Sequence, residues 1–214
     1  MIYVTRIYKN DAAWGREDDS NVLAYEVEDE KQIDVNSGIR GKLKLCLGKF
    51  PYNTFVVPNG IESIGHWAFA MPEWDVFDCT IKKIVIPESV QKIEGGAFEF
   101  THIKEVEIHP NSPCGVVKDG AVYSKDLKRL IWILKVDKKG EFVVPDGVEC
   151  ISESPFDYDI EGIELKSIVI PASVKSIEEN FDCEYTYNDV LIKAPKGSYA
   201  IEFAKERRYK YEEI

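Results

Sequence analysis

Histidine is scarce in the sequence, and the cysteines are not clustered. Five cysteines are spread over 214 residues, and no two of them form a C-x-x-C pair. Structural zinc sites need ligands at short spacings, so we expect no zinc site. An odd number of widely separated cysteines is typical of free thiols in a reducing compartment and does not suggest a disulfide framework.

Long apolar runs and excess positive charge are also missing. No stretch approaches the roughly 18 consecutive apolar residues of a membrane-spanning helix, so we expect no membrane insertion. The chain has 27 basic and 38 acidic residues, which gives a net charge of −11. A protein of this charge is poorly suited to neutralise phosphates, so we do not expect nucleic acid as a partner. With 44% hydrophobic and 30% charged residues, the composition is that of a globular protein.

Much of the negative charge is concentrated in one part of the sequence. Residues 149–189 contain eleven acidic side chains and only two basic ones, Lys166 and Lys175. This segment predicts an acidic region near one end of the fold, which would attract a basic partner or a cation. A charged surface that only aids solubility would give the same pattern.

The sequence also lacks the common signatures of catalysis. It contains no Gly-rich phosphate-binding loop, no H-E-x-x-H and no G-x-S-x-G. His66 lies just before Trp67, and an enzyme with a site near this histidine is the least favoured interpretation. We predict no catalytic residue and no cofactor.

A recognisable leader is missing as well. The first eight residues contain neither a basic segment nor an apolar stretch of signal length. This start predicts a cytoplasmic protein. A secreted or cell-surface protein whose leader had been removed would begin in the same way.

Four segments of the chain share one template, apolar-Val-apolar-Pro-x-Gly/Ser-apolar-x-x-Ile, which ends at a phenylalanine. The segments are residues 55–69, 84–98, 142–156 and 168–181. Successive template prolines are separated by 29, 58 and 26 residues, and they are Pro58, Pro87, Pro145 and Pro171. We interpret the long step as the site of an insertion.

Each position of the template has a physical role. The apolar triplet forms a short strand whose alternate side chains, such as Ile84 and Ile86, face inward. Proline cannot donate a ladder hydrogen bond and ends the strand, and Gly or Ser fits the turn that follows. The next apolar residues return to the core on a second extended stretch, and the phenylalanine fills the space between coils. One unit cannot bury its own apolar face, so the copies must stack.

The repeat resembles the BspA-like leucine-rich repeat family. Residues 84–98 match the family pattern x-x-Ile-x-Ile-Pro-x-Ser-Val-x-x-Ile-x-x-x-Ala-Phe almost throughout, and residues 55–69 match it closely. The last two copies depart from it, because Pro155 and Asn180 replace the small residue before the phenylalanine. The resemblance implies a β-rich repeat solenoid of short strands and a non-enzymatic role in binding proteins. It also implies bacterial relatives, which are often secreted or bound to the cell surface.

We expect three regions in the chain. Residues 1–50 form a β-rich N-terminal cap, to which the template does not extend. Residues 51–197 form the leucine-rich repeat solenoid, with an inserted hairpin near 114–134. Residues 198–214 form a C-terminal capping helix.

Within these regions, two elements can be predicted in more detail. The hairpin consists of one strand over residues 114–123 and a second over 127–134. The helix begins at Ser198, which is a suitable N-cap residue. Its expected buried side chains are Tyr199, Ile201, Phe203 and Ala204.

The outward positions of the repeat are the predicted binding surface for a protein partner. Strand alternation points one valine of each copy away from the core, namely Val56, Val85, Val143 and Val169. The variable positions of the second stretch include Glu62, Gln91, Glu149 and Lys175. An apolar stripe with polar margins is typical of protein-binding surfaces. Because valine is favoured in strands for its own sake, sheet packing alone is the alternative explanation.

Tryptophan residues offer a second interpretation of the function. Trp67 and Trp74 lie in one coil and its connecting loop, and Trp132 lies in the insertion. Exposed tryptophan rings stack on sugars or anchor partner proteins, so a glycan-binding module is the alternative function. Packing of these rings in the core is the simpler explanation. The sequence identifies neither a particular protein partner nor a particular glycan.

A short acidic segment is a weak candidate for binding calcium. It begins like an EF-hand loop, with Asp157, Asp159, Glu161 and Glu164 as its acidic residues. The twelfth position of such a loop requires a bidentate glutamate and is occupied here by Ile168. We therefore predict no metal site.

Overall fold

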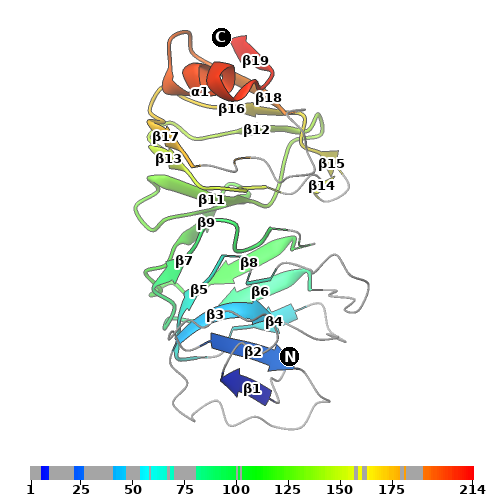
Figure 1. The fold of residues 1–214 in the computed structure, drawn as a ribbon, viewed down its shortest axis with the longest axis vertical. Coiled ribbons are helices and arrows are strands. Elements are labelled where there is room, and N and C mark those ends of the chain that lie inside the picture. The colour runs from blue at the N-terminus through cyan, green and yellow to red at the C-terminus, as the bar shows by residue number, and fades with distance from the viewer. Residues whose placement is uncertain are drawn as a thin grey trace. The chain divides into compact units, whose positions relative to one another are not determined.

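A computed structural model (Figure 1) describes most of the chain. The described residues are 6–9, 22–26, 41–46, 54–57, 59–66, 68–69, 81–99, 101, 103–156, 159–160, 163–178, 181 and 190–214. The chain divides into two compact units, Met1–Gly115 and Val116–Ile214.

Two sheets form the described part of the first unit. Their strands are β1 (Arg6–Lys9), β2 (Val22–Glu26), β3 (Gly41–Cys46), β4 (Thr54–Val56), β5 (Ile61–Ile64), β6 (Lys83–Ile86), β7 (Lys92–Ile93) and β8 (Glu105–Ile108). One sheet has the strand order β1-β2-β3-β5-β7 and the other has the order β4-β6-β8. All neighbouring strands are parallel except β1 and β2. The first two copies of the repeat each contribute one strand to each sheet, as the template predicts.

The inward side chains of these copies form the core of the first unit. Phe55, Ile84 and Ile86 have no exposed surface, and Phe69 is only 2% exposed. The closing phenylalanines Phe69 and Phe98 stack with their ring centroids 5.8 Å apart. The predicted strand alternation and the predicted place of the phenylalanine are confirmed in both copies.

Strand β3 carries the repeat sheet into the region expected to be a cap. It pairs in parallel with β5, where Leu43 lies beside Ile64. Residue 50 is therefore not a boundary within this sheet. Strand β3 lies beside β5, the second strand of a copy, and the template specifies only two apolar positions there. Such a short match is difficult to recognise in a sequence.

Strand β8 adds another strand of the repeat within the long step between template prolines. It pairs in parallel with β6 and places Val106 beside Ile84. The interpretation of this step as an insertion was therefore incomplete. The copy is difficult to recognise because Glu107 replaces the outward valine and Pro110 follows one position late.

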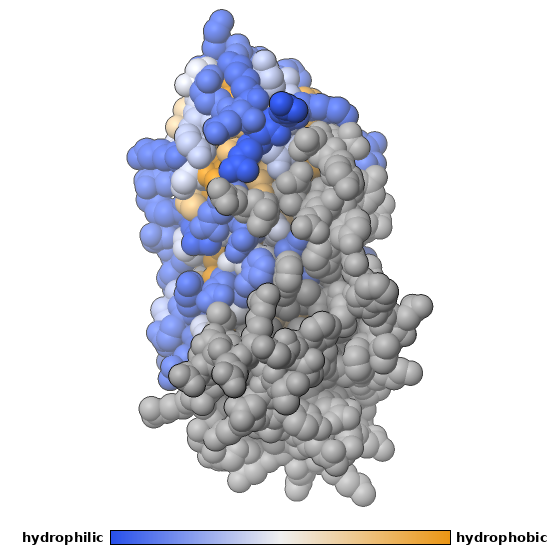
Figure 2. Space-filling view, viewed as in Figure 1, coloured by the Kyte–Doolittle hydropathy of each residue, from blue (hydrophilic) through white to orange (hydrophobic). Residues whose placement is uncertain are grey.

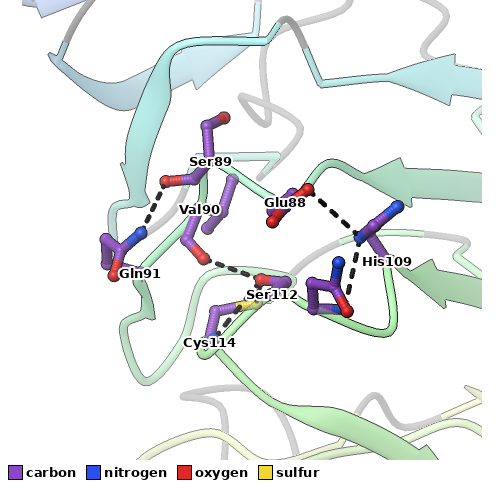
Figure 3. Close-up of polar contacts among 8 residues, drawn as sticks. Glu88, Ser89, Val90, Gln91, His109, Ser112 and Cys114 are labelled. Atoms are coloured by element: carbon purple, nitrogen blue, oxygen red, sulfur yellow. Dashed lines mark hydrogen bonds and ion pairs between the residues drawn. The ribbon is translucent and has the colours of Figure 1, made fainter.

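The turn after β8 is fixed by the fully buried Ser112 (Figure 3). The Ser112 Oγ donates to the carbonyl oxygen of Val90 at 2.7 Å, in the preceding coil. Ser89 makes the corresponding bond one coil earlier, where its Oγ donates to the carbonyl oxygen of Ile61 at 2.9 Å. A serine in the turn thus ties each of these coils to the one before it.

The second unit contains two larger sheets, a two-stranded ribbon and the helix α1 (Tyr199–Arg207). Its strands are β9 (Val116–Lys118), β10 (Ala121–Tyr123), β11 (Arg129–Ile133), β12 (Glu141–Val143), β13 (Cys150–Ile151), β14 (Asp159–Ile160), β15 (Ile163–Glu164), β16 (Ser167–Val169), β17 (Ser176–Ile177), β18 (Leu191–Ala194) and β19 (Tyr211–Glu213). The sheet orders are β17-β13-β11-β10-β9 and β12-β16-β18-β19, and the ribbon pairs β14 with β15.

The inserted segment contains two successive hairpins. Strands β10 and β11 pair antiparallel, and β9 also pairs antiparallel with β10. The single strand predicted over 114–123 is therefore wrong. The chain turns at Asp119 and Gly120, whose φ angles are 47° and 78°. Asp-Gly between strand residues is a strong hairpin signal, and it is present in the sequence at this point.

A further strand of the repeat precedes the helix. Strand β18 pairs in parallel with β16, and Ile192 lies beside Ile168. Pro195 and Gly197 follow this strand at the spacing that the template requires. The copy lacks the central valine, because Lys193 occupies that position.

Helix α1 confirms the expected C-terminal helix but is shorter than predicted. It ends at Arg207, after which β19 pairs in parallel with β18. Of the side chains expected to be buried, Tyr199 is 42% exposed, and Ala200 is buried instead. Ser198 occupies the N-cap position, but its side chain makes no capping hydrogen bond.

The helix packs onto the closing phenylalanine of the last matched copy. Phe181 makes edge contacts with Phe156, Phe203 and Tyr209, at ring-centroid distances of 5.4, 5.9 and 5.8 Å. Phe203 belongs to α1, and Tyr209 follows it. The helix therefore covers apolar side chains of the repeat, as predicted for a capping helix.

Candidate binding faces

The outward side of the sheet β4-β6-β8 is termed the first face. It consists of Thr54, Val56, Lys83, Val85, Glu105 and Glu107, which alternate along their strands with buried residues. Val56 lies beside Val85, and Val85 lies beside Glu107. The two valines are half-buried.

A lysine between two carboxylates dominates the polar half of the first face. The Lys83 Nζ lies 2.7 Å from the Glu105 Oε1 and 2.9 Å from the Glu107 Oε2. The hydrogen bond to Glu105, followed by the one to Glu107, raises the pKa of Lys83 above its ordinary value. Lys83 is therefore a cation at neutral pH and holds both glutamates at the edge of the valine pair.

The outward side of the sheet β12-β16-β18-β19 is termed the second face. It consists of Glu141, Val143, Ser167, Val169, Leu191, Lys193 and Glu212. Val143, Val169, Lys193 and Glu212 follow one another across four neighbouring strands. Val143 is 58% exposed, which is unusual for an apolar side chain within a sheet. Figure 2 shows that hydrophobic residues on the visible side of this unit form small areas among hydrophilic ones.

The second face also contains a lysine held by carboxylates. The Lys193 Nζ lies 2.6 Å from the Glu141 Oε2, and the Ser167 Oγ donates to the same oxygen at 2.9 Å. Lys193 first and Ser167 second lower the pKa of Glu141. The same hydrogen bond to Glu141 raises the pKa of Lys193. The pair is therefore fully charged at neutral pH.

The two faces share one arrangement. Each presents a pair of valines in register, Val56 with Val85 and Val143 with Val169. In each face, a charged residue on the next strand lies beside the second valine: Glu107 beside Val85, and Lys193 beside Val169. All four valines occupy outward strand positions, as the alternation predicts. The two valine pairs belong to different sheets, β4-β6-β8 and β12-β16-β18-β19.

The other predicted contact residues lie on the second stretches of the coils, away from the valine sheets. The backbone N–H of Gln91 donates to the Glu62 carbonyl oxygen at 2.7 Å, so these residues are neighbours in the first unit. In the second unit, the N–H of Lys175 donates to the carbonyl oxygen of Glu149 at 2.8 Å. The predicted contact residues are thus divided between the first stretch of each coil, which carries the valines, and the second stretch, which carries the polar residues.

Part of the acidic segment is neutralised by bases that precede it in sequence. Glu149 pairs with Lys128 at 2.9 Å, and Glu178 pairs with Arg129 at 2.9 Å. Both bases come from the chain around β11, outside the window 149–189. The predicted acidic region therefore carries less uncompensated charge than the sequence count indicates.

Trp132 does not support a stacking surface. It lies on β11, is only 2% exposed and is among the largest fully buried side chains of the described residues. For this ring, packing in the core, the simpler of the two explanations, is confirmed, and the alternative of a ring exposed for a glycan is wrong, because Leu130 to Ile133 of β11 are all buried. Trp67 and Trp74 lie outside the described residues.

His66 is held between two coils of the first unit. Its backbone N–H donates to the Glu94 Oε2 at 3.1 Å, and its Nδ1 lies 3.0 Å from the Gly95 carbonyl oxygen. These contacts join the turn of one coil to the turn of the next. Both contacts indicate that His66 helps to position one coil against the next.

The weak calcium candidate is only partly described. Asp157 and Glu161 lie outside the described residues, and Asp159 and Glu164 are register partners in the ribbon β14-β15. Where side chains are described, no group of three or more His, Cys, Asp or Glu residues could hold a metal ion. In the same part of the chain, no helix is long and apolar enough to cross a membrane.

Comparison with known proteins identifies the family. A profile described as "BspA type Leucine rich repeat region (6 copies)" matches residues 42–181. The chain belongs to this family. The profile contains six copies and begins at residue 42, whereas four copies beginning at residue 55 were recognised from the template. Strand β8, and strand β3 from its second residue onward, lie within the additional matched sequence.

A solved bacterial structure has the same fold. A leucine-rich repeat protein from Eubacterium ventriosum aligns with a TM-score of 0.53 and 18% identity, over 82% of this chain and 62% of that one. The chain thus spans about three fifths of that protein's length. The pneumococcal vaccine antigen PcpA aligns over 92% of this chain and 95% of its own, at 12% identity and a TM-score of only 0.26. No curated protein matches the sequence significantly.

Proposed function

We propose that the chain is a non-enzymatic binding module whose first and second faces contact a protein partner. The observation that carries this proposal is Val143, which is 58% exposed and lies in register beside Val169. An apolar residue in this position gains its full burial only when another molecule covers it. The family is generally one of non-catalytic binding modules, which supports the same function.

The charged groups around the valines also favour binding over catalysis. In both faces, the lysine is already bound by carboxylates, so its ammonium group is protonated and cannot act as a general base. Valine contributes area to an interface, and ion pairs at its rim contribute specificity. Glycan binding through Trp132 loses its support because that ring is buried.

Affinity capture with matched variants tests the proposal. Val143→Lys with Val169→Lys should abolish capture of the partner from the native cell or its surroundings, and Val56→Lys with Val85→Lys should weaken it. Val117→Lys is the matched control, because Val117 is an exposed valine on β9, in the other sheet of the second unit. Val143→Thr and Val169→Thr keep the shape of the side chains and guard against misfolding of the lysine variants.

The assignment would be supported if the wild type and Val117→Lys captured the partner and both second-face double variants, the lysine pair and the threonine pair, lost capture. Circular dichroism must show that each variant retains the wild-type fold. If folded second-face and first-face variants captured the same proteins as the wild type, the assignment of these faces would be wrong.

A further inference from the structure

Carboxylates outnumber cations on the first face. Lys83 is shared between Glu105 and Glu107, so these three side chains together carry a charge of −1 at neutral pH. Both glutamates are 62% exposed, and each contacts the ammonium group through one oxygen. A second oxygen of each carboxylate is therefore available at the edge of the valine pair.

The second face has the same imbalance. Lys193 bonds to Glu141, and Glu212 occupies the next position in the row of Val143, Val169 and Lys193. Asp137 is also close enough to act on the charge of Lys193. Lys193 thus lies near three carboxylates, and with Lys139, which acts on Asp137, the group still carries one more negative than positive charge. Two units with different sequences place surplus negative charge at the same side of a valine pair.

This pattern restricts the chemistry of the partner. A purely apolar partner would remove water from the surplus carboxylates without replacing their hydrogen bonds, which is costly. An acidic partner would be repelled. A partner with lysine or arginine next to an apolar side chain would bury the valines and compensate the carboxylates together. Arginine suits the site best, because its guanidinium group can bind two carboxylate oxygens at once.

We propose that each face binds a basic polypeptide segment in which an apolar side chain lies beside lysine or arginine. The apolar side chain covers Val56 and Val85, or Val143 and Val169. The cation meets Glu105 and Glu107 on the first face, or Glu212 on the second. Side chains at positions i and i+2 of an extended segment point to the same face about 6.8 Å apart, and neighbouring strands of the sheet are about 4.8 Å apart, so two such side chains can reach the valine pair and the carboxylate beside it. The proposal rests on the proposed function, because it assumes that these faces bind a polypeptide.

Two synthetic peptides of equal length test the charge preference. The sequence Gly-Val-Ser-Arg-Ser-Val-Ser-Lys-Gly places apolar and basic side chains on the same face of an extended peptide, and Gly-Val-Ser-Glu-Ser-Val-Ser-Glu-Gly replaces the bases with acids. Binding of each peptide to the full chain is followed by NMR titration at low salt. We expect the basic peptide to bind and the acidic one not to bind. About 0.5 M salt should weaken the interaction, because the charges are exposed to solvent.

Charge variants locate the binding. Glu105→Gln with Glu107→Gln, combined with Glu212→Gln, should weaken binding of the basic peptide about fivefold or more. Glu202→Gln with Glu206→Gln removes two charges from α1 and serves as the control, with an expected change of less than about twofold.

The outcomes separate this inference from the proposed function. Equal binding of both peptides, binding of neither, or equal weakening by the α1 control would each overturn the basic-segment proposal. The valine variants in affinity capture report independently on the faces. Loss of partner capture in those variants, with no preference for the basic peptide, would leave the proposed function standing and refute the charge preference.

Discussion

The backbone N–H of Gly60 donates a hydrogen bond to the Oγ of Ser89, 29 residues later, at a distance of 3.0 Å. The two residues occupy the same template position in successive coils, two places after the proline. Gly147 and Ser173 repeat the relationship at 3.0 Å in the second unit. Gly in one coil and Ser in the next thus form a complementary pair: the glycine has a positive φ, and the serine reaches back to its N–H.

Replacing the serine should remove this link between coils. In Ser89→Ala, the Gly60 N–H and the Ile61 carbonyl oxygen both lose their partner, so we expect a loss of about 1–2 kcal/mol in the free energy of unfolding. Denaturant unfolding monitored by circular dichroism measures the change. Ser176→Ala, an exposed serine on β17, should change stability by less than about 0.5 kcal/mol. Equal losses in the two variants would contradict the assigned role.

A pair of glycines separates steric overlap from backbone strain. Gly140 and Gly147 have φ angles of 78° and 93°, so alanine is strained at either position. A Cβ at Gly147 would meet nothing within 4 Å, whereas a Cβ at Gly140 would overlap the carbonyl oxygen of Glu164. We expect Gly147→Ala to cost about 1 kcal/mol and Gly140→Ala to cost distinctly more, about 3 kcal/mol. Similar unfolding midpoints for the two variants would show that the backbone at residue 140 adapts freely.

The sequence predicted the repeat where proline, valine and phenylalanine coincide at fixed spacing. Each of these residues has a strong local reason for its position, so the strands around Ile84 and Ile168 were placed correctly. Strands β8 and β18 were missed because Glu107 and Lys193 stand in place of the outward valine. The α1 boundary was missed because Arg208, and not glycine, ends the helix.

The binding faces were predictable only in part. Strand alternation places the four valines outward without knowledge of the fold. The ion pair of Glu141 with Lys193 joins residues 52 positions apart, and that of Lys83 with Glu105 joins residues 22 apart. Such pairings depend on which strands become neighbours, and the unrecognised strands supply one partner of each. The charge at the edge of the valines was therefore not visible in the sequence.

Ionisation of Tyr123 should reduce the stability of the folded protein at high pH. Its hydroxyl is buried and, among the described residues, has no hydrogen-bond partner. Burial, and to a smaller extent Asp119, raise the pKa of Tyr123 to about 12 from the ordinary 10.0. Because the folded pKa is the higher one, this group's stabilising contribution is complete below pH 10 and is lost as the pH rises towards 12.

The substitution Tyr123→Phe tests this account. Removing an unsatisfied hydroxyl should leave stability at pH 7 unchanged or increase it by about 1 kcal/mol. The advantage of the variant over the wild type should grow between pH 10 and pH 12, the window set by the two pKa values. Unfolding curves at several pH values measure it, with the exposed Tyr199→Phe as the matched control. A clear loss of stability at pH 7 would show that the hydroxyl has a partner.

Glu141 should make the folded protein less stable as the pH falls into the acid range, whereas Tyr123 makes it less stable as the pH rises. Lys193 and Ser167 lower its pKa, so the carboxylate of Glu141 is protonated at a lower pH in the folded chain than in the unfolded chain. The resulting stabilisation is present above the ordinary value of 4.5 and is lost as the pH falls through the folded value. Glu141→Gln should therefore be less stable than the wild type at pH 7, and the difference should shrink on acidification. Glu206→Gln, on α1, provides the control, and a constant difference across the pH range would refute the assignment.

The end of helix α1 offers a stabilising substitution. The N–H of Tyr209 donates to the Ala204 carbonyl oxygen at 2.9 Å, and the N–H of Arg208 donates to that of Lys205 at 3.4 Å. Tyr209 also stacks on Phe203, with ring centroids 5.7 Å apart. These bonds and this contact form a Schellman motif, in which the residue with the left-handed conformation is usually glycine. Here it is Arg208, with φ 64°.

Arg208→Gly should therefore raise the free energy of unfolding by about 0.5–1 kcal/mol, because glycine adopts this φ without strain. The control is Arg207→Gly, one residue earlier, where the backbone is helical and glycine should cost about 1 kcal/mol. Both substitutions remove one arginine, so loss of charge alone would change stability in the same direction in both. Opposite shifts of the unfolding midpoint would establish the backbone conformation at Arg208 as the cause, and shifts of equal sign would reject it.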